Sequence, residues 1–399
     1  MVPHFRHKAF NKILKPFIRA FLFCFYGYKA KVYKNLKENY LIISNHVTQI
    51  DPIMLSLSFK KPIYFVASDD IFSIKIISSL LEYFMSPISK TKNEIDISTT
   101  KNIISMMKNG GSVGIFISGN ATYSGVEEYI PSPIARLVKK IGKPLILYNI
   151  IGCYGVAPRW GEKLRKGKCS GQIKRIILPS EYNNMTDEEL DEIIKNEINV
   201  DALKNDNRYY NCKNRAHFLE RALFVCPDCG SIGSLKSEKN SIRCEKCGYE
   251  AEYQEDLTFK LIKGKIHFHS VKQWYDYQKG YLYDFDYDKY EDEDPIKIDN
   301  DIYFILNHRL KHKETLIFKG QSRLYKNRIE IEKNDAKITL NFTDIKSMSV
   351  QGKNKLLLHV DDKYYQIRGN KRRSGVLYMF IYYSLKNKKE GKCNGFLGI

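Results

Sequence analysis

Short apolar runs alternate with amphipathic stretches between residues 40 and 149. Apolar runs bounded by turn residues predict buried strands, and apolar positions at helical spacing between them predict helices. The expected strands are 41–44, 62–67, 113–117 and 144–151. The expected helices are 71–84, 98–108 and 133–141. This order predicts an α/β domain in which a mixed sheet with some parallel pairing is flanked by helices.

A further helix is expected after residue 185, because Thr186 is a good capping residue and an acidic first turn follows it. We expect this helix to close a first domain at residues 31–222. Residues 1–30 come before it, with a basic beginning and an apolar, phenylalanine-rich middle. This composition predicts an amphipathic helix lying on a membrane surface, and a helix packed on its own domain is the alternative.

The last hundred residues change to the period of two that is typical of strands. The expected strands are 314–318, 322–324, 328–333, 337–342, 355–360 and 363–367. A terminal helix is expected at 375–385, and residues 389–399 form a tail. Several antiparallel strands followed by one helix resemble a pleckstrin-homology or GRAM-type module, which we expect at 313–388. Residues 253–312 are expected to connect to it.

The chain has 399 residues and a net charge of +20, which favours nucleic acid, an anionic membrane surface or phosphorylated substrates as partners. Its hydrophobic fraction of 43% argues against a largely disordered chain. We expect no transmembrane helix, because no apolar run reaches the length that spans a bilayer. The basic residues are spread along the chain without an RNA-binding aromatic motif, so nucleic acid is the least favoured partner.

Four of the nine cysteines form two Cys-x-x-Cys pairs, each followed by glycine. Each turn directs two thiolates to one side of a metal, and four thiolates close a tetrahedral site. Cys226, Cys229, Cys244 and Cys247 therefore resemble a Cys₄ zinc ribbon, expected at 223–252 with a structural Zn²⁺. Metal-binding cysteines also indicate a reducing compartment.

The strand at 41–44 leads into Asn45-His46 and, five residues later, Asp51-Pro52. A neutral imidazole held by a carboxylate can remove the proton of an alcohol that attacks a thioester. The carboxylate would fix the imidazole tautomer and stabilise the imidazolium that forms. His46 and Asp51 are therefore the candidate catalytic pair.

Asn45-His46-x-x-x-x-Asp51, with the strand before it and proline after it, resembles the first motif of the lysophosphatidic acid acyltransferase family. The similarity extends over about residues 38–160. It implies an O-acyltransferase of phospholipid biosynthesis that uses His46 and Asp51, with Asn45 in the substrate site. Lys90 lies where the family's second motif has an arginine for the acceptor phosphate, and a lysine keeps the charge but not the bidentate fork.

The family's third motif, typically Phe-Pro-Glu-Gly-Thr-Arg-Ser, corresponds to the segment from Phe116 to Ser124. Ser118 and Ala121 replace its glutamate and arginine, while Gly119 and Asn120 fit a known variant. Ser118, Gly119 and Asn120 are expected in substrate binding, with the backbone N–H of Gly119 offered to an oxyanion.

A fourth motif, an apolar strand after Lys-Pro, is matched at 143–151. Arg159 follows this strand and stands beside Trp160, and it is expected to take over binding of phosphate or CoA.

The resemblance implies transfer of a fatty acyl group from acyl-CoA or acyl carrier protein to a lysophospholipid such as 1-acylglycerol 3-phosphate. The altered third motif leaves two alternatives open: a different acceptor alcohol, or a catalytically silent lipid-binding protein. We expect a cytoplasmic, peripheral protein on anionic lipids at the inner face of the cell membrane. The abundance of Lys, Asn and Ile suggests a bacterial source.

Overall fold

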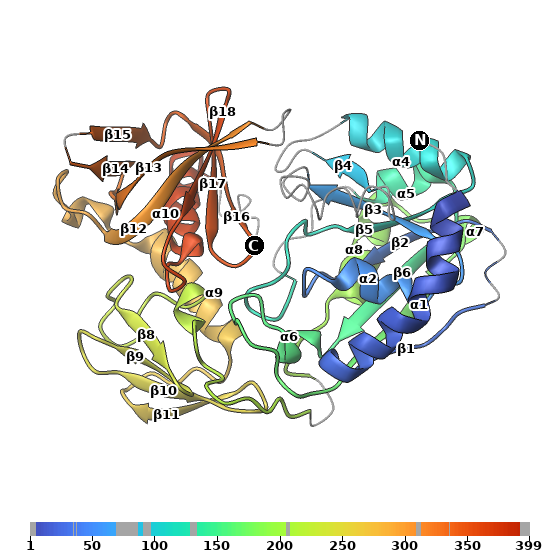
Figure 1. Cartoon of the computed structure of the whole chain (residues 1–399), viewed down its shortest axis with the longest axis horizontal. Coiled ribbons are helices and arrows are strands. Elements are labelled where there is room, and N and C mark those ends of the chain that lie inside the picture. The colour runs from blue at the N-terminus through green and yellow to red at the C-terminus, as the bar shows by residue number, and fades with distance from the viewer. Residues whose placement is uncertain are drawn as a thin grey trace. The chain divides into compact units, whose positions relative to one another are not determined.

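The computed structural model describes residues 5–34, 36, 38–68, 87–90, 97–127, 134–204, 208–308, 313–334 and 336–391. The chain forms two compact units (Figure 1). The first consists of the described residues up to Arg159 together with Leu164–Asn211, and the second of Trp160–Lys163 and the described residues from Cys212 onward.

A seven-stranded mixed sheet forms the centre of the first unit, in the order β1-β7-β6-β2-β5-β3-β4. Its strands are β1 (Tyr28–Ala30), β2 (Leu41–Ser44), β3 (Ile63–Ser68), β4 (Ile88–Lys90), β5 (Ser112–Phe116), β6 (Leu145–Ile151) and β7 (Cys169–Ile177). Strands β6, β2, β5, β3 and β4 are parallel, whereas β7 is antiparallel to β6. The expected mixed sheet is confirmed. The antiparallel strand β7 was not expected, because polar residues interrupt its apolar pattern.

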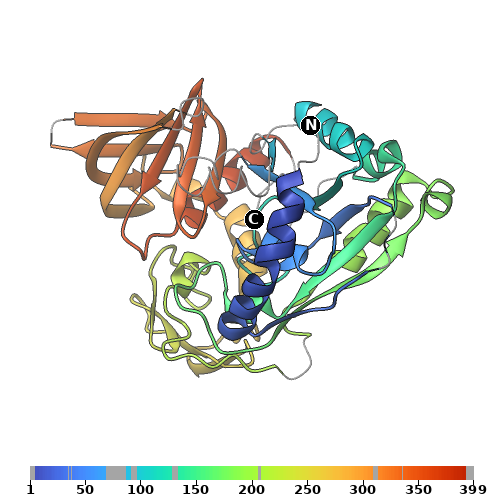
Figure 2. The same ribbon diagram turned by 45° about the vertical axis from the view of Figure 1, so that its right-hand side comes forward.

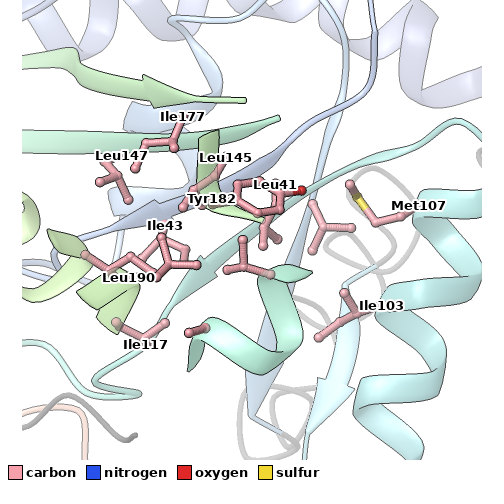
Figure 3. Packing of buried hydrophobic residues seen from close by; sticks show 14 of the residues in the cluster. Leu41, Ile43, Ile103, Met107, Ile117, Leu145, Leu147, Ile177, Tyr182 and Leu190 are labelled. Carbon is pink, nitrogen blue, oxygen red and sulfur yellow. The ribbon is translucent and has the colours of Figure 1, made fainter. Parts of the chain in front are cut away.

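Helices α4 (Ile97–Lys108), α5 (Ile134–Ile141) and α8 (Asp187–Ile198) cover one face of this sheet (Figure 3). Their apolar side chains pack on odd-numbered residues of the central strands, such as Leu41, Ile43 and Leu147. Helix α8 begins at the expected residue, because the hydroxyl of Thr186 accepts the Glu189 N–H and the Glu189 carboxylate accepts the Thr186 N–H. The short helices are α2 (Asp51–Ser56), α6 (Cys153–Val156) and α7 (Pro179–Tyr182).

Helix α1 (Phe5–Tyr26) lies across the sheet in both views of the molecule (Figure 1, Figure 2). Lys15 donates to the carbonyl of Phe59, and Arg19 donates to the carbonyls of Leu57 and Ala30. These bonds and the buried Leu22 attach the helix to its own domain. A set of large apolar side chains nevertheless remains exposed on it: Ile13, Phe17, Phe21, Phe23 and Phe25. Among the described residues, no helix is long and apolar enough to cross a bilayer.

The second unit begins with a four-stranded antiparallel sheet, in the order β11-β10-β9-β8. Its strands are β8 (Leu235–Glu238), β9 (Ser241–Cys244), β10 (Glu250–Tyr253) and β11 (Phe259–Lys263). Helix α9 (Val271–Asp284) follows, and the short helices η2 (Leu219–Arg221) and η3 (Tyr287–Lys289) flank this region.

A seven-stranded antiparallel sheet completes the second unit, in the order β15-β14-β13-β12-β18-β17-β16. Its strands are β12 (Lys297–His308), β13 (Lys313–Leu324), β14 (Arg328–Lys333), β15 (Ala336–Asn341), β16 (Ile345–Gln351), β17 (Lys355–Val360) and β18 (Lys363–Arg368). Helix α10 (Gly375–Lys389) is almost entirely buried, and its Phe380 ring contacts the rings of Phe224 and Tyr275. The expected antiparallel sheet with a terminal helix is confirmed.

Several details differ from the sequence-based expectations. Strand β12 lies inside 253–312, which we expected to be a connecting segment, because Asp299, Asn300 and Asp301 interrupt its apolar pattern where it bulges. Strand β13 is continuous where two strands were expected, since Gly320 lets it approach the Glu332 carbonyl closely and is not a turn. Strand β16 and helix α9 were not expected. The helix expected at 71–84 lies outside the described residues.

One disulfide joins Cys153 to Cys169, with 5.0 Å between their Cα atoms. It connects α6 to the start of β7 in the first unit. The sequence gave no spacing signal for it, because two half-cystines that lie sixteen residues apart meet only when β7 returns beside β6.

Candidate active site

His46 and Asp51 meet at the carboxyl end of strand β2. His46 lies two residues beyond the strand, and Asp51 is the first residue of α2. The Nδ1 atom of His46 is 2.9 Å from Oδ2 of Asp51. The His46 side chain is 17% exposed and that of Asp51 is fully buried, so the imidazole lies between solvent and a buried carboxylate.

The Asp51 carboxylate also organises the turn that carries His46. Its Oδ2 accepts the backbone N–H of Val47 at 2.6 Å and of Thr48 at 2.8 Å. Its Oδ1 accepts the Thr48 hydroxyl at 2.6 Å. Because a buried carboxylate with several donors favours its charged form, Asp51 is an acceptor for the N–H at Nδ1 of His46. The lone pair of a neutral His46 then lies on Nε2, as a general base requires.

The aromatic ring of Phe116 packs beside the imidazole, with 4.6 Å between the ring centroids. Phe116 ends strand β5, which pairs with β2, so the sheet itself places this ring against His46. The bond to Asp51 and the contact with Phe116 together fix the plane of the imidazole.

Asn45 is 2% exposed, and both ends of its side-chain amide bind strand β6. Its Nδ2 donates to the Ile150 carbonyl at 2.9 Å, and its Oδ1 accepts the Ile150 N–H at 2.8 Å. The expected role of Asn45 in substrate binding therefore has no support from its bonds. They show instead that Asn45 fixes the chain just before His46.

The third-motif segment follows β5 and forms a turn beside His46. The Ser118 hydroxyl donates to the Asn120 carbonyl at 3.1 Å. Gly119 is exposed and has a φ of 70°, and its N–H donates to the Phe116 carbonyl at 3.0 Å. That N–H is engaged within the turn, which differs from the expectation that it faces an oxyanion.

Two charged side chains lie against the next part of the chain. Arg159 is 7% exposed, donates from Nη1 to the Ala121 carbonyl at 2.7 Å and packs 4.3 Å from the centroid of the Tyr123 ring. Arg159 thus reaches the position where the family's arginine is missing, but it binds the backbone there, so its expected contact with phosphate or CoA is unsupported. Oε1 of Glu127 accepts the backbone N–H of His46. Glu127 was not expected, because no motif spacing marks it.

Lys90 is the last residue of β4, at the edge of the sheet. Its side chain lies outside the described part of the structure, so its expected role stays a prediction.

Cys226, Cys229, Cys244 and Cys247 place their four sulfur atoms within 4.8 Å of one another. The Cys226–Cys247 and Cys229–Cys244 sulfur pairs are 3.6 Å and 3.8 Å apart. A tetrahedral metal with bonds of about 2.3 Å to sulfur requires separations of about 3.8 Å, so the four residues fit a closed Cys₄ site.

The surroundings of these cysteines also suit thiolates. Gly230 and Gly248 have positive φ values, and their N–H groups donate to Cys226 and Cys244 carbonyls to close the two turns. Burial alone would raise the pKa of the Cys244 thiol, but hydrogen bonds from Ser234 and neighbouring backbone N–H groups outweigh it and lower the pKa to about 6. A metal bound here would have four protein ligands and no open position for a substrate.

Residues 27–142 match the family model described as Acyltransferase. Among solved structures, the first unit is similar to the 1-acyl-sn-glycerophosphate acyltransferase PlsC from Thermotoga maritima. That match has 18% sequence identity and a TM-score of 0.41, and it covers 48% of this chain and 78% of the other. No curated protein matches the chain.

Proposed function

Because residues 27–142 form a domain of the acyltransferase family, we propose that the protein is an O-acyltransferase acting on a lysophospholipid. The donor is acyl-CoA or acyl carrier protein, and the acceptor is an alcohol such as that of 1-acylglycerol 3-phosphate. The observation that carries this proposal is the pairing of a partly exposed His46 with a buried, fully hydrogen-bonded Asp51 at the end of β2.

In the proposed reaction, Nε2 of His46 removes the proton of the acceptor hydroxyl as its oxygen attacks the thioester carbonyl carbon. Asp51 accepts the N–H at Nδ1 and stabilises the imidazolium. The carbon–sulfur bond then breaks, and the imidazolium returns its proton to the departing thiolate. The products are the ester and the free thiol, and His46 is again neutral.

The altered third motif supports a second candidate acceptor. Ser118 and Ala121 stand where the family has a glutamate and an arginine, and the nearest described guanidinium, that of Arg159, binds the Ala121 carbonyl. A phosphate monoester would therefore lack a bidentate partner in this turn. An acceptor without a phosphate monoester, or one whose phosphate is bound by Lys90, fits this site. We retain Ser118, Gly119 and Asn120 as proposed substrate contacts.

We also propose that α1 attaches the enzyme to a membrane surface. The exposed Phe17, Phe21, Phe23 and Phe25 support this, since phenylalanine side chains insert at the boundary of headgroups and acyl chains. The net charge of +20 favours anionic lipids. For the Cys₄ site we propose a structural Zn²⁺, which would be bound by Cys226, Cys229, Cys244 and Cys247.

Acyl transfer by zinc-replete wild type and His46→Ala tests the proposed function. Labelled acyl-CoA and acyl carrier protein serve as donors, and lysophosphatidic acid or neutral and zwitterionic lyso-lipids as acceptors. We expect wild-type turnover to fall by at least about 10³-fold in the variant, since a general base contributes roughly 10²–10⁴-fold. The preferred acceptor identifies the substrate class.

A folded wild type that binds lipid vesicles but acylates none of these acceptors would favour the silent lipid-binding alternative. Equal turnover by wild type and His46→Ala would exclude His46 as the base.

A further inference from the structure

The loop of residues 121–127, which follows the third-motif turn, holds both backbone polar groups of His46. The Thr122 N–H donates to the His46 carbonyl at 3.0 Å. The carboxylate of Glu127 accepts the His46 N–H. The catalytic histidine is thus attached to this loop through its main chain and to Asp51 through its side chain.

The loop is itself strongly ordered. The Thr122 hydroxyl accepts the N–H of Gly125 at 3.1 Å and donates to the Val126 carbonyl at 2.7 Å. Tyr154 donates from its hydroxyl to the Tyr123 carbonyl at 3.0 Å. These bonds leave Glu127 at a defined distance from Thr122, so that the two residues can reach the two sides of the His46 peptide.

Arg159 supports the same loop from the start of the following segment. Its guanidinium donates to the Ala121 carbonyl and packs on the Tyr123 ring. Removing this buried cation would leave the Ala121 carbonyl without that bond and would loosen the end of the loop nearest the third-motif turn.

A hydrogen bond from a backbone N–H to a carboxylate is charge-assisted and stronger than one between neutral groups. Catalysis depends on such positioning, because a displacement of about 1 Å at a reacting group can lower the rate roughly 10²-fold. The family's third motif carries its carboxylate at the position of Ser118, where this chain has none. A carboxylate from another part of the loop therefore lies beside the base.

We propose that Glu127 is a positioning residue for the general base His46, and that Arg159 fixes the loop from which Glu127 acts. This inference rests on the proposed acyl transfer. It assigns a structural part of the reaction to two residues outside the motif positions, and it explains how the base stays oriented although the third motif has lost both charged residues.

The kinetic test compares Glu127→Ala and Glu127→Gln with wild type. We expect Glu127→Ala to lower kcat about 10²-fold while KM for donor and acceptor stays within about threefold, because the base is displaced but the substrate contacts remain. Glu127→Gln keeps an oxygen that can accept the His46 N–H, so it should recover kcat to within about tenfold of wild type. Glu192→Ala, an exposed change on α8, is the matched control and should leave kcat unchanged.

Amide hydrogen exchange of His46 in the full chain tests the same contact without any turnover. Selective ¹⁵N-histidine labelling should show exchange at His46 at least about tenfold faster in Glu127→Ala than in wild type, with Glu127→Gln in between. If wild type shows no acyl transfer and this exchange difference is found, the proposed function fails and the positioning contact stands. Unchanged exchange, or a KM increase with unchanged kcat, would overturn the proposed role of Glu127.

Discussion

The catalytic pair combines a residue near solvent with one that has no exposure. Asp51 binds His46, two backbone N–H groups and the Thr48 hydroxyl, so its charge is compensated entirely by donors within one turn. The site therefore does not depend on a distant cation to keep the aspartate ionised. This local arrangement requires both carboxylate oxygens to be acceptors.

Asp51→Asn tests that requirement. An amide can offer one acceptor oxygen only, so its NH₂ group would oppose the N–H of a neighbour, and the imidazole would lose its preferred tautomer. We expect kcat to fall by about 10³-fold or more and the free energy of unfolding to fall by roughly 1–3 kcal/mol. Steady-state kinetics and urea unfolding measure the two effects. Asp361→Asn, in an exposed turn with a φ of 52° that asparagine tolerates, should change neither; wild-type activity in Asp51→Asn would contradict the assignment.

At the scale of single elements, α1 shows two different faces. Lys15, Arg19 and Leu22 attach it to the first unit, and burial together with the nearby Arg19 lowers the pKa of Lys15 to about 8. Its phenylalanines point away from that contact, with Phe17 70% exposed. The two interpretations of this segment are therefore compatible, since the helix packs on its domain and still presents an apolar face.

Replacing Phe17, Phe21 and Phe25 together by serine tests the exposed face. Because these side chains are more than half exposed, the thermal midpoint should change little, while binding to anionic vesicles should weaken at least about tenfold. Vesicle sedimentation at several salt concentrations measures this. The control is Leu316→Ser with Ile317→Ser, which removes exposed apolar residues from β13. Equal loss of binding in both proteins would contradict a specific role for α1.

At the scale of the whole molecule, each unit contains one site of distinct chemistry. The first unit has the His46–Asp51 pair, and the second has four cysteines with the separations of a closed metal site. No described residue near the catalytic pair is a cysteine of that set. A metal at the Cys₄ site would therefore stabilise the second unit without taking part in proton transfer.

Removal of zinc from the whole chain tests this division. We expect about one zinc per chain in the purified protein, and a lower unfolding temperature of the second unit after chelation or in Cys244→Ser, because metal binding contributes directly to folding free energy. Metal analysis and calorimetry measure the two quantities. Cys212→Ser, outside the cluster, is the matched control. A chain that purifies without metal and melts identically with added zinc would exclude the structural zinc.

The sequence alone determined the chemistry that depends on short spacing. His46 and Asp51 lie five residues apart on one turn, and each Cys-x-x-Cys pair closes a local knuckle, so residue order is enough to bring their atoms together. Strands with uninterrupted apolar patterns were also predicted with their observed bounds, as for β2, β14 and β17.

Only the tertiary structure decided which distant residues complete the site. Asn45 binds Ile150 across 105 positions, Glu127 reaches the His46 backbone across 81, and Arg159 reaches Ala121 across 38. Such contacts follow from the order in which strands pair and from the path of the loops between them, and no local pattern encodes either. The same reason explains β7 and β12, whose polar residues conceal strands that form because neighbouring strands need partners for their backbone hydrogen bonds.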